Sequence, residues 1–375
     1  MTSQTNQQNS SAASIGARAP RRSLIDFIKN WEILLLALII IVVVVNTNLS
    51  PYFLNAKNLS RTSSDFMEIG LMMLPMVFIV VTGNIDLSVA SNMGMSASFM
   101  GLLHNMGVNI WLAALAGLAL GTLGGLLNGY LIAKVKLPSL VVTLGTYAFF
   151  RGIAYGFLGD QAARNYPSAF TYLGQGRVGD SLIPVSVAIF IGLAIVFGLV
   201  LHATKFGRQL FAIGNNEEAA KYSGVPIDRI KFTLFVLSGF MAAFAGLVLA
   251  ARFGSTRPDN GTGLELAVIT ATVLGGVDIN GGKGSMYGAI LSLLLIGLLR
   301  FGMGLLNIQS QVQSTIIGLL LIVSIFLPHI GQQITANKAS RFRWKTILGV
   351  IGVLALFVLF FVFFFWSRTP VLADI

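Results

Sequence analysis

Two runs of the chain place an aspartate beside glycines where a long apolar stretch ends. The first reads GNIDLS (residues 83–88) and the second reads GGVDIN (residues 275–280), and a further apolar segment follows each. Irregular backbone with a carboxylate at such a boundary is typical of broken membrane helices that line a solute path. A tight turn whose aspartate caps the next helix also explains the pattern, so both interpretations stay open. The expected path residues are Gly83, Asn84, Asp86, Ser88, Gly275, Gly276, Asp278 and Asn280.

The run GGVDINGGKGS looks like a phosphate-binding loop but has the wrong spacing. Such a loop needs a glycine, four further residues, Gly-Lys and then Ser or Thr. Counted from Lys283, the first glycine position holds Val277 and the hydroxyl position holds Gly284. The chain has no cysteine, and its three histidines are scattered, so neither a metal set nor a catalytic cluster is predicted. We therefore expect a protein that is not an enzyme and does not itself hydrolyse ATP.

Charged residues near the apolar segments lie mostly at the ends of those segments. A proton- or sodium-coupled carrier would concentrate carboxylates in the middle of its helices, where isolated charges are otherwise costly. The distribution argues against ion coupling. An ion-coupled secondary sugar transporter is nevertheless the alternative function, because such carriers also contain repeats and broken helices. The charged residues concerned are Asp65, Glu68, Asp86, Arg151, Glu265, Asp278 and Arg300.

The composition is that of a membrane protein. Of 375 residues, 55% are hydrophobic and 10% are charged, and the mean hydropathy is +0.80. A soluble domain has about 25% charged residues. The net charge of +11 comes from basic residues that gather between the apolar stretches, where they set the orientation in the membrane. Nucleic acid is therefore not an expected partner, and the predicted fold class is an all-α integral membrane protein.

About ten transmembrane helices are expected within a domain at residues 23–333, with one extra helix after it. The predicted helices cover approximately residues 31–49, 64–82, 88–106, 110–133, 138–157, 183–202, 231–252, 264–279, 285–306 and 311–331, and the extra C-terminal helix covers 346–366. The segment 264–279 is the shortest, which favours a re-entrant stretch or part of a broken helix. Residues 1–22 are predicted to form a disordered cytosolic tail, and residues 334–345 a basic linker.

The positions of lysine and arginine predict the orientation. With the N-terminus in the cytosol, the helix count places Lys134, Lys136, the loop 203–230 and the basic linker on the cytosolic side. This agrees with the excess of positive charge in the cytoplasmic loops of membrane proteins. We expect a multi-pass protein of the plasma (inner) membrane of a prokaryote.

The loop 203–230 carries the signals of a short capped helix. Asparagines at the start, two glutamates in the first turn, and Gly224 with Pro226 at the end are typical helix boundaries. A capped helix in a cytosolic loop of a membrane protein suits the docking of a partner, and the plainer interpretation is a turn between two helices. The expected contact residues are Gly214, Asn215, Asn216, Glu217, Glu218, Ala219, Ala220 and Gly224.

Three segments resemble, in the same order, the permease subunits of monosaccharide-type ABC importers (the ribose, xylose and galactose group). VVTGNIDLSVA and ATVLGGVDINGGKGSMYGA are similar to the two glycine-rich signatures of that family, and AIGNNEEAAKYSGV is similar to its ATPase-docking loop. The match covers roughly residues 60–330. Asn84 and Ala90 stand where the family usually has glycine. The segments TSSDFMEIGLMMLP and RFGSTRPDNGTGLEL are closer to the rhamnose or autoinducer-2 branch.

The resemblance implies the pore-forming subunit of an ATP-driven sugar importer. Its expected partners are a separate ABC ATPase subunit that grips the 207–226 loop, an extracytoplasmic sugar-binding protein, and a second permease copy or paralogue. ATP would be used by the ATPase partner, and no cofactor is expected on this chain. Arg252, Arg257 and Asp259 are predicted in an outer loop and are the candidates for docking the binding protein through salt-sensitive contacts.

Four glycines, at positions 117, 121, 125 and 129, share one face of the helix predicted at 110–133. Such a face lets a neighbouring membrane helix approach closely. We expect this face to pack within the chain, and the alternative is a seam between two copies.

Overall fold

The computed structural model describes residues 31–322, and every regular element in that range is helical. The described residues up to Gly318 belong to one compact unit. The predicted tail (1–22), basic linker (334–345) and extra helix (346–366) lie outside the described residues. The elements are α2 (Trp31–Leu49), α3 (Ala56–Ser63), η1 (Ser64–Phe66), α4 (Met67–Val81), α5 (Val89–Asn105), α6 (Ile110–Gly129), η2 (Tyr130–Lys134), α7 (Ser139–Leu158), α8 (Ser168–Gln175), α9 (Val185–Ala203), α10 (Lys205–Asn215), α11 (Glu217–Tyr222), α12 (Ile227–Phe253), α13 (Leu264–Leu274) and α14 (Met286–Leu305).

Seven helical stretches in the described range are long and apolar enough to cross a membrane. They are Trp31–Leu49, Ala56–Val81, Ile110–Lys134, Ser139–Leu158, Val185–Ala203, Ile227–Phe253 and Met286–Leu305. Three further expected segments also contain helices, but these are shorter: α5, α13 and the helix Ser310–Ile322. The predicted all-α membrane class is therefore confirmed, with seven candidate spans by length and composition.

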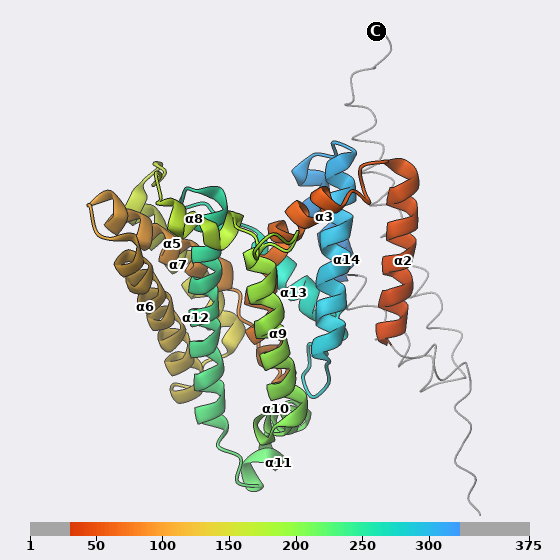
Figure 1. Cartoon of the computed structure of the whole chain (residues 1–375). Helices are drawn as coiled ribbons and strands as arrows, with labels where there is room; N and C mark the ends of the chain where they lie inside the picture. Colours follow the sequence, from red (N-terminus) through yellow and green to blue (C-terminus); the bar gives the residue numbers. More distant parts are fainter. Residues whose placement is uncertain (1–30, 323–375) are drawn as a thin grey trace, which may run out of the picture. The chain divides into compact units, whose positions relative to one another are not determined.

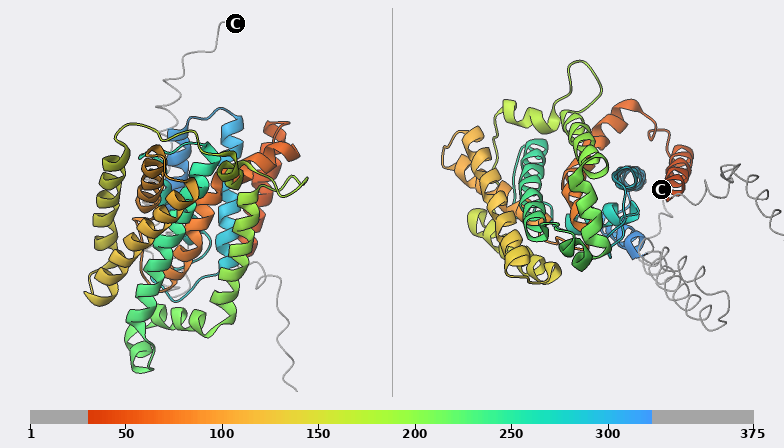
Figure 2. Two further views of the ribbon diagram at one scale, coloured as in Figure 1. Left: turned by 60° about the vertical axis from the view of Figure 1, so that its left-hand side comes forward. Right: turned by 90° about the horizontal axis from the view of Figure 1, so that it is seen from below.

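Helices α4 and α5 form the centre of the bundle. All 15 residues of α4 are buried, as are most residues of α5. α5 packs against α6, α7 and α12, while α4 packs against α9, α12 and α13. By contrast, α2 lies at the edge of the bundle beside α14 (Figures 1 and 2) and buries only Leu35 and Asn46. The apolar surface that α2 leaves uncovered fits contact with lipid.

Glycines bring α6 and α12 into direct backbone contact. A Cβ built on Gly125 would overlap the carbonyl oxygen of Phe235 and would lie 2.9 Å from the Cα of Gly239. One turn further along α6, a Cβ on Gly129 would lie 3.0 Å from the carbonyl oxygen of Phe232. The glycine face of α6 therefore packs within the chain, as the sequence predicted.

The segment predicted at 264–279 is helical from Leu264, and irregular backbone between α12 and α13 precedes it. Its helix α13 has only 11 residues. Before α13, the carbonyl oxygen of Asn260 accepts a 3.1 Å hydrogen bond from the guanidinium of Arg151 on α7. A Cβ on Gly94 of α5 would lie 3.2 Å from the same oxygen. Irregular backbone inside a membrane protein is tolerated where protein surrounds it, which agrees with the expected broken helix.

A small set of hydrogen bonds fixes the start of this irregular segment. Thr256 and Ala163 exchange two backbone hydrogen bonds of 2.8 and 2.9 Å. The Tyr166 hydroxyl donates a 2.8 Å hydrogen bond to Thr256 Oγ1. Burial raises the pKa of Tyr166 to about 12, so the hydroxyl remains protonated and keeps its role as donor.

We expect Gly125→Ala to destabilise the bundle by about 1–3 kcal/mol, because the added methyl group would push α6 away from α12. Gly192→Ala on α9 is the matched control, since nothing lies within 4 Å of its Cβ position. Alanine is favoured over glycine within a helix by up to about 1 kcal/mol, so the control should be neutral or stabilising. Thermal unfolding of both purified variants in detergent measures the difference, and equal melting temperatures would contradict the close α6–α12 contact.

Candidate functional site

The loop 203–230 forms two helices, α10 and α11, joined at Asn216. The Asn216 backbone is extended, and its side-chain oxygen accepts a 2.9 Å hydrogen bond from the amide of Ala219. Glu217 and Glu218 follow in the first turn, where negative charge interacts favourably with the helix dipole. The predicted asparagine-capped helix is therefore present, although α11 has only six residues.

The other expected contact residues of this loop have different environments. Gly214 and Asn215 belong to the last turn of α10, not to the capped helix. Ala220 is 4% exposed and faces the protein. Gly224 has a φ of 80°, a conformation that glycine adopts without strain. The exposed glutamates Glu217 and Glu218 are thus better placed to meet a partner than the buried Ala220.

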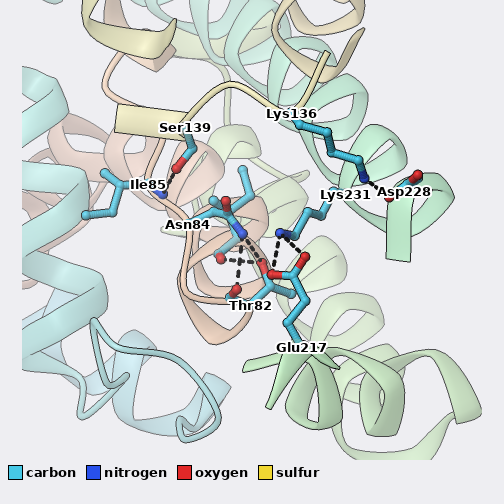
Figure 3. Close-up of polar contacts among 9 residues, drawn as sticks. Thr82, Asn84, Ile85, Lys136, Ser139, Glu217, Asp228 and Lys231 are labelled. Carbon is cyan, nitrogen blue, oxygen red and sulfur yellow. Dashed lines mark hydrogen bonds and ion pairs between the residues drawn. The ribbon is translucent and has the colours of Figure 1, made fainter. Parts of the chain in front are cut away.

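Two ion pairs fix α11 and the start of α12 (Figure 3). Lys231 of α12 contacts Glu217 at 2.8 Å, and Lys136 pairs with Asp228. Exposed ion pairs contribute about 1 kcal/mol or less. The Glu217–Lys231 pair therefore mainly sets the position of α11 against α12, and the Lys136–Asp228 pair joins the start of α12 to the loop after η2. Glu218 forms no hydrogen bond or ion pair within residues 31–322, which leaves its carboxylate available to another chain.

The two glycine–aspartate runs end their helices in the same way. Gly83, after α4, has a φ of 73°, and Gly276, after α13, has a φ of 85°. In each run the glycine amide bonds to the carbonyl three residues back, and the next amide bonds to the carbonyl five residues back. This is the Schellman arrangement, in which a left-handed residue closes the end of a helix. Glycine is needed at both positions because other residues rarely adopt this backbone conformation.

Each aspartate then stabilises the turn that follows its glycine. Asp86 Oδ1 accepts hydrogen bonds from the Ser88 amide at 2.9 Å and the Ser88 hydroxyl at 2.6 Å. Asp278 Oδ1 accepts from the Asn280 amide at 3.0 Å and from the Asn280 side-chain amide at 3.2 Å. Both are Asx turns, which an aspartate forms with the backbone two residues on. The tight turns of the second interpretation are therefore present, but neither aspartate caps the next helix, because Ser88 holds the N-cap position of α5 and Ser285 caps α14.

The two carboxylates nevertheless lie in different surroundings. Asp86 is 2% exposed, and its Oδ2 accepts a 2.8 Å hydrogen bond from Ser238 of α12. Asn128 of α6 donates a 2.8 Å hydrogen bond to the Ser88 hydroxyl. Asp278 is partly exposed, and its side-chain bonds are local. Asp86 therefore joins the start of α5 to α6 and α12 inside the bundle, whereas Asp278 shapes its own loop.

The α10–α11 loop and both glycine runs meet at one point. The amide of Gly282 donates a 2.8 Å hydrogen bond to the carbonyl of Val81, the last residue of α4. A Cβ on Gly214 of α10 would overlap both of these atoms. A Cβ on Gly83 would lie 3.3 Å from the carbonyl oxygen of Asn280. We call this contact of Val81, Gly83, Gly214 and Gly282 the glycine junction.

At the opposite end of α12, the candidate docking residues are of two kinds. Arg252 is already engaged, since its guanidinium contacts Glu68 Oε1 at 2.8 Å and Asp65 Oδ1 at 2.7 Å. The Glu68 side chain is 2% exposed, so Arg252 compensates a buried charge. Arg257 and Asp259 instead form an exposed pair at 3.0 Å and remain accessible to a partner.

Four residues of the site were not identified from the sequence. They are Val81 and Gly282 of the glycine junction, and Ser238 and Asn128 of the Asp86 network. The signal for Gly282 was present, because the second run continues as GGKG beyond the segment that matches the first run. The serine and asparagine carry no such signal, since one hydroxyl or amide in an apolar helix most often bonds locally.

Comparisons with known proteins give consistent results. Residues 58–325 match the family described as the permease component of the branched-chain amino acid transport system. The chain is 37% identical over 320 residues to the Autoinducer 2 import system permease protein LsrD of Escherichia coli (strain K12), covering 84% of this chain and 95% of that protein. The protein of the same name from Shigella flexneri gives the same values, and that from Escherichia coli O157:H7 is 36% identical. No solved structure matches the chain.

We expect Asp86→Ala to destabilise the protein by about 1–3 kcal/mol, because the buried hydroxyl of Ser238 and the polar groups of Ser88 would lose their acceptor. Asp278→Ala is the matched control, since it removes the equivalent aspartate of the second run from a partly exposed turn. The melting temperatures of the two purified variants measure the effect. An Asp278→Ala variant as unstable as Asp86→Ala would contradict the structural role of the buried network.

Proposed function

The chain belongs to the permease family that residues 58–325 match, as a permease of an ABC importer, and we propose that it forms part of the solute path of an importer for a monosaccharide or a related furanosyl compound. The substrate class rests on two supports. The relatives that match over 95% of their length are named as autoinducer 2 import permeases, and the glycine–aspartate signatures resemble those of monosaccharide permeases. The chain is a non-catalytic subunit, and a separate subunit hydrolyses the ATP.

The observation that carries the proposal is the geometry of α11. In the proposed complex the ATPase subunit holds this helix from the cytosol, with Glu218 as an exposed contact. Two connections lead from the α10–α11 loop into the bundle: the Glu217–Lys231 ion pair joins α11 to α12, and the glycine junction joins α10 to α4 and the α13–α14 loop. Closure of the ATPase subunits would move α10 and α11 as a rigid body and so change access to the path.

The path itself is proposed to run beside the two glycine–aspartate turns. Their residues from Gly83 to Ser88 and from Gly275 to Asn280 border the glycine junction, so a displacement of α11 reaches them first. A second permease copy or a paralogue is expected to complete the path. Specificity would lie mainly in the binding protein, because a path must release its solute as readily as it binds it.

On the opposite side, an extracytoplasmic binding protein is proposed to dock beside Arg257 and Asp259. Their charges are exposed and paired only with each other, so they can exchange partners with small cost. Arg252 contributes indirectly, since its ion pairs with Glu68 and Asp65 hold the end of α12 on the start of α4. Charged residues at the edge of an interface mainly accelerate association of the two proteins and make its rate dependent on salt.

The proposed topology has ten membrane helices in the domain 23–333 and the N-terminus in the cytosol of a prokaryotic cell. The seven candidate spans are complemented by α5, by the broken segment that ends in α13, and by Ser310–Ile322. In this orientation Lys134, Lys136 and the α10–α11 loop face the cytosol, in line with the distribution of positive charge in membrane proteins.

Glu218→Lys is expected to weaken the association with the ATPase subunit about tenfold or more, because it replaces an exposed carboxylate of the proposed docking helix by a positively charged ammonium group. Asp180→Lys is the matched control, a charge reversal in the α8–α9 loop at the opposite end. Co-purification of each tagged variant with the ATPase subunit gives the readout. Equal recovery of the ATPase with both variants would contradict docking through α11.

Reconstituted uptake tests the function as a whole. Proteoliposomes that contain the permease, its ATPase and its binding protein should take up a labelled furanosyl compound or monosaccharide only when ATP is inside and the binding protein outside. A panel of autoinducer 2, ribose and rhamnose distinguishes the branches. Uptake driven by a proton or sodium gradient without ATP would support the ion-coupled alternative and contradict the proposal.

A further inference from the structure

A cavity of about 650 Å³ opens between the end of α6 and the start of α12. Tyr130 and Lys134 line it from η2, a π-helical turn that continues α6. Arg229, Phe232 and Thr233 line it from the first two turns of α12. The cavity therefore lies at the end of α12 that leads to α11, at the bottom of Figure 1. Single π-helical turns in a helix are frequently found at functional sites.

The cavity carries two positive charges that form no ion pair of their own, although the Asp228 carboxylate, which pairs with Lys136, also attracts Lys134. The neighbouring lysines Lys136 and Lys231 are paired with acidic side chains. Lys134 and Arg229, by contrast, form no side-chain hydrogen bond or ion pair within residues 31–322. Two unpaired cations on facing elements of one cavity are suited to an anion, and a phosphate group can accept hydrogen bonds from an ammonium and a guanidinium together.

The surroundings of the cavity are apolar and uncovered. The exposed apolar side chains on the neighbouring turns are Leu127, Tyr130, Val135, Leu137 and Leu140, each between 38% and 56% exposed. In a chain that spans a membrane, such side chains meet lipid. Aromatic residues such as Tyr130 collect at the level where the lipid tails give way to the headgroups. The mouth of the cavity thus lies where a phospholipid presents its phosphate to protein.

We propose that this cavity binds the headgroup of an anionic phospholipid. The phosphate would lie between Lys134 and Arg229, with the rings of Tyr130 and Phe232 beside the glycerol and the acyl chains along the exposed apolar side chains. Basic cavities between membrane helices are suited to anionic headgroups. Free inorganic phosphate offers the same charge but makes no use of the apolar surroundings, so the lipid is the occupant that the whole site fits.

Native mass spectrometry of the full-length protein in detergent, titrated with phosphatidylglycerol or phosphatidylcholine, tests the proposal. The variant is the double substitution Lys134→Gln and Arg229→Gln. The matched control is Lys205→Gln with Arg208→Gln, which removes the same charge from α10, outside the cavity. A thermal melt of each variant confirms that it is folded before lipid is added.

The native protein should bind phosphatidylglycerol more tightly than phosphatidylcholine, and the cavity variant should lose about tenfold or more of its affinity for phosphatidylglycerol. The control should bind as the native protein does. Equal losses in the two variants would reduce the effect to overall charge and overturn the proposal. Binding of inorganic phosphate that excludes phosphatidylglycerol would overturn it too, by assigning the site to the free ion. If the cavity variant is unfolded, the single substitution Arg229→Lys must still weaken binding of phosphatidylglycerol. An ammonium group cannot form the two parallel hydrogen bonds that a planar guanidinium donates to a phosphate.

Discussion

One contact, made mainly of backbone atoms, joins the elements at the end of the bundle where α10 lies. Gly214 of α10 lies against the hydrogen bond between the Gly282 amide and the Val81 carbonyl, at a distance that leaves no room for a side chain. The contact therefore connects α10 to the end of α4 and to the α13–α14 loop through backbone atoms, and the Asn215 side-chain amide adds a 3.4 Å hydrogen bond to the Gly282 carbonyl. Because α4 is buried along its whole length, we expect a displacement at this point to reach the centre of the bundle.

Helix α12 links this end of the molecule to the other. It has 27 residues, about 40 Å at the rise of an α-helix. Lys231 joins its first turns to α11, Ser238 joins it to Asp86 in the interior, and Arg252 joins its last turn to Glu68 at the start of α4. Polar contacts thus tie one helix to α11, to the start of α5 and to the start of α4, which suits a subunit that must relate ATP hydrolysis on one side to a binding protein on the other.

The parts that could be predicted from the sequence are those whose cause is local. The Asn216 cap and the glycine turns depend on backbone conformation within a few residues, and both are present where the sequence indicated them. The glycine face of α6 could be recognised because its period is that of the helix. The long apolar segments predicted the helices, and the short segment 264–279 indicated a break, but the sequence did not indicate that Arg151 from a distant helix stabilises the irregular backbone before α13.

What could not be predicted depends on contacts between distant residues. The sequence offers no sign that Arg252 and Glu68, 184 residues apart, form an ion pair, so Arg252 was expected to be free for docking. Asp86 and Asp278 look equivalent in the two runs, yet only Asp86 is buried, and only Asp86 has a hydrogen-bond partner on a distant helix, Ser238. The burial of a side chain and the identity of its hydrogen-bond or ion-pair partner depend on how the helices pack, and a single sequence does not indicate that packing.

The most direct measurement of the central claim is ATP-driven uptake by the reconstituted importer carrying Gly214→Ala, with ATPase binding and ATP hydrolysis recorded on the same sample. A methyl group at this position must separate α10 from Val81 and Gly282. We predict that the ATPase still binds, since α11 is unchanged, but that uptake per ATP hydrolysed falls about tenfold or more. Uptake per ATP equal to that of the native protein would contradict transmission through the glycine junction.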